Sequence, residues 1–357
     1  MGMPDVFLKA IASLYKNPKF AVRTKVANSS WRKQDRGIRQ GCPLSPYLFI
    51  IVMTVMFRDI HDELNLGRGR LPGLDFTELL YADDTALLTN NLNAMNRILA
   101  KIESHANYFG LSFNKTKCVA MNFNAFGNAK FSNGDMVPTA AETKYLGAVI
   151  SSSHDLRREV SNKISSCFVT LNKLNFFWSK SNCPTKFKIN VYDAVVRAKL
   201  VYGLDVVCLP GYLERQLNVF QLKGLRKILG MKTTYIDRTN TNKKVFENAN
   251  SAINVSSHTV KQIKTFSGYL HQKQESLLKH IVRLDSSDPL RQATLEHDTP
   301  LPKQPLQRRV GRPREHWADN VYKKMWTKYN FGVATQYKQD PNTCISHMSA
   351  KIMRKEI

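Results

Sequence analysis

Two adjacent aspartates between two short apolar runs constrain the fold of this chain most. Residues 79–88 read Leu-Leu-Tyr-Ala-Asp-Asp-Thr-Ala-Leu-Leu, which puts Asp83 and Asp84 at the centre of the segment. Each apolar run has the length of a buried strand, so the segment predicts a β-hairpin with both acids at its tip. Neighbouring carboxylates repel each other, and a hard divalent cation such as Mg²⁺ relieves that repulsion. The pattern by itself leaves two interpretations open: an ordinary polar turn, where paired aspartates are common, or a metal-binding hairpin.

The charge balance points to a polyanionic partner. The length of 357 residues predicts two or three domains, and 43% hydrophobic residues are enough to build their cores. The formal net charge of +25 predicts that the protein binds nucleic acid. A membrane surface is the alternative, but the best apolar run, residues 47–57, is too short to cross a bilayer. Seven acids and only two arginines lie between residues 59 and 84, a pattern expected where metal ions and a polyanion meet.

Cysteine usage and the N-terminus suggest an intracellular protein. The six cysteines are widely spaced and form no C-x-x-C pair or Cys/His ligand pattern, which favours reduced thiols over a disulfide framework or a zinc knuckle. The first residues lack a basic stretch followed by an apolar one, so no secretory signal is visible. We expect a protein of the nucleus or of a cytoplasmic ribonucleoprotein that is not secreted.

The first 123 residues predict three helices and two further strands. Apolar spacing indicates helices over residues 3–16, from Ser45 onward and over 91–109, and a strand over 118–123. Residues 20–31 indicate a strand that gives way to a turn at 28–30. Ser45 is expected as the N-cap and Pro46 as the first helical residue of a helix that is apolar all round and hence buried. Before it, Gly37 and Gly41 allow either a tight turn or close backbone approach to a ligand.

The second half predicts helices that begin near Asp155, near Pro184 and at Leu213, the last closed by Gly230. Residues 151–235 hold 14 Lys or Arg and 5 Asp or Glu, which suits a grip on the phosphate backbone. Residues 301–314 carry five basic groups and resemble an AT-hook that inserts arginine into the minor groove. The alternative is a basic linker before a helix at 317–326. The arginines concerned are Arg308, Arg309, Arg312 and Arg314.

Four short motifs follow one another along the first half of the chain, at residues 39–46, 81–84, 110–117 and 144–147. In order and spacing they resemble the motifs of reverse transcriptases, and most of all those of the polymerase proteins of non-LTR (LINE-type) retrotransposons. The likeness continues through residues 192–203, 220–230 and 311–317, so that it covers most of the chain.

The resemblance implies an α+β fold: a polymerase palm, an antiparallel sheet with packed helices, followed by a helical thumb. Partial fingers and the palm would occupy residues 1–150, the thumb 151–235, and a mainly helical, basic, nucleic-acid-binding region 236–357. The implied activity is RNA-directed DNA synthesis, in which two metal ions, Mg²⁺ or possibly Mn²⁺, assist phosphoryl transfer to a primer 3′ end. The implied partners are an RNA template, a DNA primer and a deoxynucleotide, and the oligomeric state stays open.

The resemblance also assigns site residues. Asp83 would bridge the two metal ions, Asp84 would be the supporting carboxylate, and Lys117 would assist the pyrophosphate. The nucleotide-binding residues would be Arg39, Gln40, Gly41 and Tyr81, and the primer grip would be Tyr145, Leu146 and Gly147. For Lys117 the plain alternative is a surface lysine.

The chain departs from the family's pattern at one point. The family's first metal-binding aspartate lies on a strand before the helix that begins here near Met3, and this sequence starts after that strand. We therefore expect an N-terminally truncated reverse transcriptase that is a poor polymerase by itself. The first alternative is a catalytically dead remnant that only binds RNA or DNA. The second is a group II intron maturase, against which the match of residues 190–317 to the LINE-type tail counts.

Overall fold

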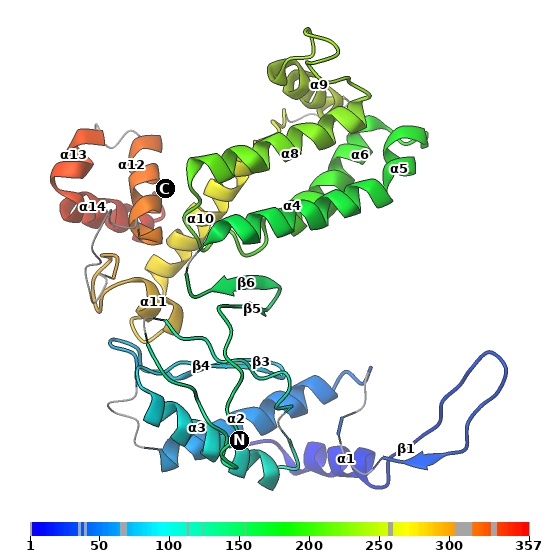
Figure 1. Ribbon diagram of the computed structural model, residues 1–357, viewed down its shortest axis with the longest axis vertical. Helices are drawn as coiled ribbons and strands as arrows, with labels where there is room; N and C mark the ends of the chain where they lie inside the picture. Colours follow the sequence, from blue (N-terminus) through cyan, green and yellow to red (C-terminus); the bar gives the residue numbers. More distant parts are fainter. Residues whose placement is uncertain are drawn as a thin grey trace. The chain divides into compact units, whose positions relative to one another are not determined.

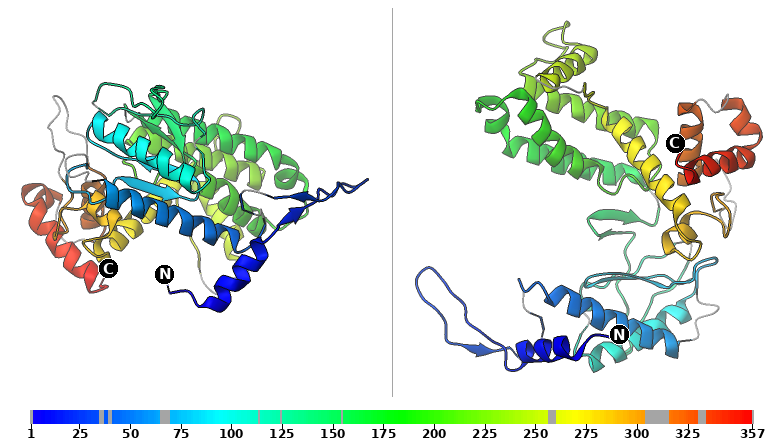
Figure 2. Two further views of the ribbon diagram at one scale, coloured as in Figure 1. Left: turned by 90° about the horizontal axis from the view of Figure 1, so that it is seen from below. Right: turned by 180° about the vertical axis from the view of Figure 1, so that it is seen from behind.

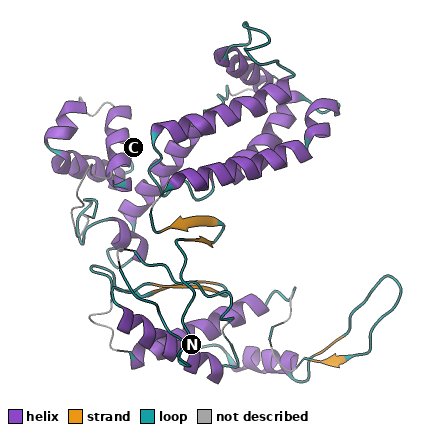
Figure 3. Cartoon of the chain, viewed as in Figure 1, coloured by secondary structure: helices purple, strands orange, loops and turns teal. Residues whose placement is uncertain are grey.

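The computed structural model describes residues 2–34, 37–38, 41–64, 70–112, 114–123, 125–153, 155–255, 260–303, 316–329 and 334–356 (Figure 1). Helices dominate, and the described strands form three separate two-stranded antiparallel sheets (Figure 3), which confirms the predicted α+β class. The chain divides into two compact units. The first unit is Met1–Leu71, Thr77–Cys118 and Gly127–Pro138, and the second is Pro72–Phe76, Val119–Phe126 and Thr139–Ile357. The expected division at residues 150 and 235 stays a prediction.

The core of the first unit lies between two helices, α2 (Ser45–Glu63) and α3 (Leu92–Tyr108). Helix α3 begins as predicted, because the Asn91 side chain caps it by accepting a hydrogen bond of 2.7 Å from the Ala94 N–H. Gly110 follows its end at φ +71°, a left-handed backbone that glycine adopts without strain. The core side chains include Met53, Met56, Phe57, Ile60, Ile98 and Ile102. Helix α1 (Asp5–Tyr15) confirms the helix predicted at residues 3–16.

Four predictions for this region are wrong in detail. Ser45 is the first residue of α2 and not its cap, and its hydroxyl lies 3.1 Å from the Tyr15 hydroxyl. Helix α2 is not buried all round: Tyr47 and Ile50 are exposed, because α3 covers one face of the helix. Residues 20–31 contain the end of the two-residue strand β1 (Lys19–Phe20), which pairs with β2 (Arg32–Lys33), and an isolated antiparallel bridge between Arg23 and Asn28. Residues 118–123 form one isolated bridge, from Ala120 to Thr139, in place of a strand.

In the longest segment of the second unit, a hairpin of β5 (Glu142–Tyr145) and β6 (Ala148–Ser151) precedes a bundle of helices (Figure 2). Two predicted helix starts are confirmed, because Asp155 caps α4 and Pro184 precedes α6. Helix α8 begins at Gly211 instead of the predicted Leu213, and it ends at Gly230, with φ +66°, as predicted. The segment after α6 is π-helical, which periodicity did not predict. The helices are α4 (Leu156–Lys173), α5 (Asn175–Lys180), α6 (Thr185–Val191), η1 (Tyr192–Arg197), α7 (Ala198–Val201), α8 (Gly211–Leu229), α9 (Asn242–Asn254) and α10 (Phe266–Arg283).

Two hydrophobic cores build this unit. One runs from Val160 to Leu270 through helices α4 to α10, and the other from Leu278 to Ile352. Helix α10 contributes to both, so it joins the bundle to the last helices. These are α11 (Pro289–Thr294), α12 (Trp317–Lys328), α13 (Ala334–Gln339) and α14 (Pro341–Met353). The helix expected at 317–326 is thereby confirmed as α12. Among the described residues, the helices fall short of the length and apolarity needed to cross a membrane.

Candidate metal and nucleic-acid sites

The predicted hairpin is present, with both acids at its tip. Strands β3 (Glu78–Tyr81) and β4 (Asp84–Leu87) pair in antiparallel register, with Tyr81 opposite Asp84 (Figure 1). The loop is therefore Ala82 and Asp83. Ala82 has φ +52°, and a left-handed first loop residue is typical of a two-residue type II′ turn. This geometry places Asp83 in the turn and Asp84 at the first position of β4, and both residues are exposed.

The two strands are not buried, contrary to the prediction. Leu79 and Leu80 are 41% and 40% exposed, and Tyr81 is 64% exposed. Among the described residues of the hairpin, Leu87 of the returning strand packs against the hydrophobic core between α2 and α3. A two-stranded ribbon has two faces, and apolar composition alone does not show which of them another element covers.

Hydrogen bonds at the base of the hairpin hold it to α2. His61 Nε2 of α2 lies 2.5 Å from Glu78 Oε1, and the Thr77 hydroxyl donates to Glu78 Oε2 at 2.7 Å. The Thr77 carbonyl accepts a bond of 2.7 Å from the Leu88 N–H, which closes the ladder. Glu78 is one of the seven acids between residues 59 and 84, and it anchors the hairpin instead of joining the tip.

Other members of the acidic run are engaged elsewhere. Glu63 accepts from Lys101 at 2.6 Å and lies 3.3 Å from His105, and these partners lower the pKa of its carboxyl. Asp75 belongs to the second unit, where its side chain accepts a bond of 2.8 Å from Gln292. The run of acids is therefore divided between two structural roles and the hairpin tip.

The tip offers ligands that suit Mg²⁺ or Mn²⁺ in kind. Carboxylate oxygens are the donors that such hard cations prefer, and Asp83 and Asp84 supply them at an open position. Two side chains are fewer than a two-ion centre needs. Within the described part of the chain, no group of three or more His, Cys, Asp or Glu side chains is arranged to hold a metal.

Of the other predicted catalytic and nucleotide-binding residues of the first unit, Tyr81 lies opposite Asp84 in the hairpin, whereas Lys117 and Gly41 belong to turns elsewhere in the chain. Lys117 is exposed in a turn after α3, where its N–H donates to the Asn114 carbonyl at 3.0 Å. Gly41 has φ +84° and open space where a Cβ would lie, so the left-handed turn by itself accounts for the glycine. Among the described residues, no hydrogen bond or ion pair joins Lys117 to Asp83 or Asp84. Arg39 and Gln40 lie outside the described residues.

The residues predicted to grip the primer form the turn of the β5–β6 hairpin in the second unit. Tyr145 pairs with Ala148, so the loop consists of Leu146 and Gly147. Their φ angles are +46° and +85°, and two left-handed residues in succession define a type I′ turn. Tyr145 and Leu146 are half-buried, whereas Gly147 is exposed.

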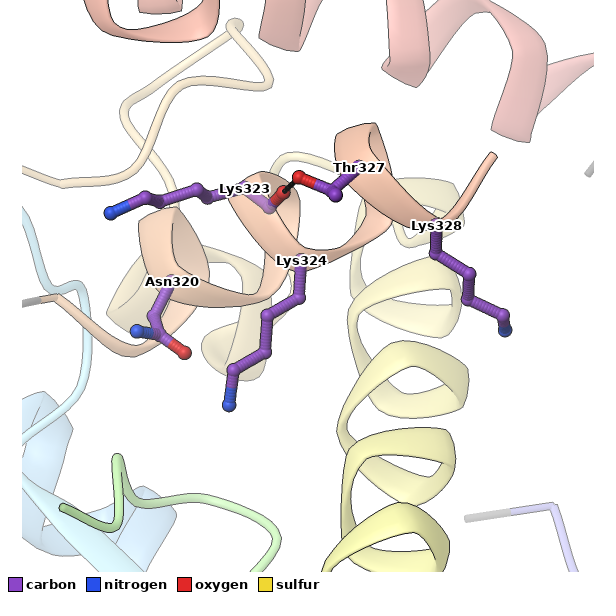
Figure 4. Close-up of a pocket in the computed structure, with 5 residues that line it drawn as sticks. All are labelled: Asn320, Lys323, Lys324, Thr327 and Lys328. Atoms are coloured by element: carbon purple, nitrogen blue, oxygen red, sulfur yellow. Dashed lines mark hydrogen bonds between the residues drawn. The ribbon is translucent and has the colours of Figure 1, made fainter. Parts of the chain in front are cut away.

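The four predicted nucleic-acid-binding arginines, at positions 308, 309, 312 and 314, lie outside the described residues. The helix after them carries a basic face that the sequence reasoning missed. Three lysines of α12 and two polar neighbours line a surface hollow of about 460 Å³ (Figure 4). They are Asn320, Lys323, Lys324, Thr327 and Lys328. Their helical spacing, opposite the buried Val321, Met325 and Trp326, was the available signal.

A buried glutamate, Glu275, and a half-buried one, Glu214, hold two of these lysines in place. Lys328 lies 2.5 Å from Glu275 Oε2 of α10, and Lys324 lies 3.5 Å from Glu214 of α8 and 2.9 Å from His271. Burial opposes ionisation of Glu275, but hydrogen bonds from Lys279, Lys328 and Tyr329 outweigh it and lower its pKa to about 2. The ammonium groups are thus positioned by carboxylates on neighbouring helices.

Parts of the chain are similar in sequence to known proteins. Residues 2–150 match the family model described as "Reverse transcriptase (RNA-dependent DNA polymerase)". The chain is 27% identical over 241 residues to an RNA-directed DNA polymerase from the mobile element jockey of Drosophila funebris, an alignment that covers 64% of this chain and 25% of that protein. It is 30% identical over 153 residues to a Pol polyprotein from the type-1 retrotransposable element R2 of Nasonia vitripennis, covering 39% and 14%. The chain thus spans a quarter or less of these two relatives.

Proposed function

We propose that the Asp83–Asp84 hairpin binds the divalent metal of RNA-directed DNA synthesis. The hairpin lies within residues 2–150, which match the reverse transcriptase family model, and the chain is similar to polymerase proteins of the mobile element jockey and the retrotransposable element R2. The observation that carries this proposal is the pair of exposed carboxylates at the turn of a hairpin inside the family segment. Bound Mg²⁺ would stabilise the charge that develops on the oxygens of the transferring phosphoryl group. Asp83 in the turn and Asp84 on β4 would hold the ion, with Asp84 in the supporting role.

The remaining roles follow the same assignment. Lys117 would neutralise charge on the leaving pyrophosphate, and Tyr81 with Gly41, Arg39 and Gln40 would contact the incoming deoxynucleotide. Tyr145, Leu146 and Gly147 would contact the primer strand. An RNA template and a DNA primer are the proposed partners, supported by the net charge of +25.

The domains we propose are a palm with partial fingers over residues 1–150, a helical thumb from 151, and a basic C-terminal region. The hairpins of the first 151 residues and the helices after them support this order. The continuous core from Val160 to Leu270 supports a thumb that extends beyond residue 235. The lysines of α12 support nucleic-acid contact by the C-terminal region.

We propose that this chain by itself extends a primer only weakly, since two carboxylates supply too few ligands for two ions. A second candidate function is nucleic-acid binding without synthesis. The basic face of α12 favours it, because phosphate contact there needs no metal.

Primer extension on an RNA template tests both candidates. The wild-type chain is compared with Asp83→Asn and with Glu247→Gln, a matched loss of one exposed carboxylate on α9. We expect weak, Mg²⁺- or Mn²⁺-dependent extension that Asp83→Asn abolishes and Glu247→Gln preserves, together with weaker Mn²⁺ binding in Asp83→Asn by electron paramagnetic resonance.

The other outcomes are equally informative. Strong extension that Asp83→Asn abolishes would contradict the proposed weakness and keep the metal assignment. Extension that survives Asp83→Asn would contradict the assignment. Salt-dependent nucleic-acid binding without extension would support the second candidate.

A further inference from the structure

The turn of the β5–β6 hairpin has a backbone that requires support. Leu146 has φ +46°, a left-handed conformation that a branched side chain rarely adopts, and Gly147 follows at φ +85°. A non-glycine residue in this region persists where the surrounding contacts hold it there. The turn of Leu146 and Gly147 is also the segment that would contact the primer strand.

Tyr202, at the end of α7, supplies such a contact. Its hydroxyl donates a hydrogen bond of 2.9 Å to the Leu146 carbonyl. A Cβ at Gly147 would lie 3.3 Å from the ring of Tyr202, so the ring also covers the glycine closely. The next residue, Gly203, leaves room for the Ala148 side chain, which would lie 3.4 Å from an added Cβ. The short segment after α7 therefore lies against both residues of the turn and against the first residue of β6.

Side chains of helix α4 also contact the β5–β6 hairpin. Glu159 accepts a bond of 3.2 Å from the Val149 N–H and pairs with Lys163 at 3.1 Å, and both side chains are buried. The Lys163 ammonium lies 5.6 Å from the centroid of the Tyr202 ring, which links the two contacts. At the base of the hairpin, Arg158 forms an ion pair of 2.7 Å with Glu142.

The exposure of Tyr202 distinguishes its role from core packing. Tyr202 is 56% exposed, whereas its neighbours Leu200 and Leu204 are buried in the hydrophobic core of the bundle. The Tyr202 hydroxyl therefore does not contribute to packing of that core. An exposed tyrosine whose hydroxyl bonds the carbonyl of a left-handed residue chiefly restrains that residue.

We propose that Tyr202 is a positioning residue that, with the Lys163–Glu159 pair behind it, fixes the Leu146–Gly147 turn against the end of a primer strand. The inference rests on the proposed function, because the primer contact of this turn comes from that assignment. All of the contacts lie within the second unit, so the restraint needs no particular placement of the first unit.

Amide hydrogen exchange tests the restraint directly. Tyr202→Phe keeps the ring and removes the hydroxyl, and Tyr235→Phe is the matched control at a 97% exposed tyrosine in a loop. We expect exchange at residues 146–149 to become about three- to tenfold faster in Tyr202→Phe, the range that loss of one hydrogen bond supports. Exchange in α8 and α9 should stay unchanged, as it should throughout Tyr235→Phe. Unchanged exchange in the hairpin, or equal acceleration everywhere, would overturn the proposal.

Binding then tests the link to the primer. A DNA primer annealed to a longer RNA template is compared with a blunt hybrid duplex of equal charge by fluorescence anisotropy. Tyr202→Phe should reduce the preference for the recessed 3′ end while leaving affinity for the blunt duplex unchanged. If Tyr202→Phe speeds exchange in the hairpin but leaves the preference for the recessed 3′ end unchanged, the proposed link between Tyr202 and the primer is wrong. Absence of primer extension by the wild type would count against the proposed function alone, because neither measurement requires catalysis.

Discussion

At the scale of single residues, Glu275 shows how a side chain on one helix organises the charges of its neighbours. Its carboxylate lies 2.7 Å from Lys279 of the same helix and 2.5 Å from Lys328 of α12, and the Tyr329 hydroxyl donates to it. Burial opposes its ionisation, yet these donors lower its pKa from 4.5 to about 2. A carboxyl with a lowered pKa in the folded state stabilises that state wherever it is ionised.

The acid stability of the second unit should therefore depend on Glu275. Its contribution is complete above pH 4.5 and is lost as the pH falls towards 2. After allowance for solvent screening, we expect about 1–2 kcal/mol from this group. Denaturant unfolding at pH 6 and at pH 3 measures it: Glu275→Gln should lose more stability at pH 6 than at pH 3. Glu247→Gln on α9 is the control, and an equal loss at both pH values would refute the assignment.

At the scale of elements, the bundle depends on a close approach between α8 and the π-helical segment η1. A Cβ built at Gly224 of α8 overlaps the ring of Tyr192, which is fully buried in η1. Tyr192 also stacks on Phe266 of α10 at 5.9 Å between ring centroids, so the ring has little freedom to move away. The glycine is required here by the neighbouring ring, because the backbone of Gly224 is an ordinary helical one.

Substitution of this glycine should destabilise the bundle strongly. Gly224→Ala gains helix propensity but forces the Tyr192 ring aside, and we expect a net loss of about 1–3 kcal/mol in the free energy of unfolding. Gly211→Ala is the matched control at the start of the same helix, where the nearest side-chain atom would lie 3.9 Å from the new Cβ. Thermal and urea unfolding should show it to be neutral or slightly stabilising. Equal effects of the two substitutions would argue against the close packing.

At the scale of the whole molecule, the excess of basic residues governs association with polyanions. Fifty-three Lys or Arg residues face 28 Asp or Glu residues, and the lysines of α12 show where part of this excess gathers. Contacts between lysine and phosphate release counterions, so their number appears as the slope of affinity against salt concentration.

Loss of one phosphate contact should reduce that slope. For Lys323→Gln we expect the slope of log K against log salt to fall by about 0.9 on duplex DNA and about 0.7 on a single strand. Lys243→Gln on α9, at a side chain that is 88% exposed, removes the same charge and should leave the slope nearly unchanged. Fluorescence titration between low and moderate salt measures both. Identical slopes in the two variants would show that α12 makes no phosphate contact.

The order of elements and several of their ends could be read from the sequence, because they depend on residues close together in the chain. Asn91, Asp155 and Gly230 mark helix ends through caps that involve their immediate neighbours. Asp83 and Asp84 between two apolar runs predicted a hairpin tip for the same local reason. The π-helical turns of η1 were missed, since they arise where Tyr192 packs against another helix.

The sequence by itself determined the α+β class, the hairpin that carries Asp83 and Asp84, and the basic character of the chain. Tertiary structure alone decided which faces are covered, as in the exposure of Leu79 and Leu80. It also decided which distant residues meet, as when Tyr202 contacts Leu146 across 56 positions. The physical reason is that turns and caps are settled by neighbours in the chain, whereas burial and positioning depend on side chains that only folding brings together.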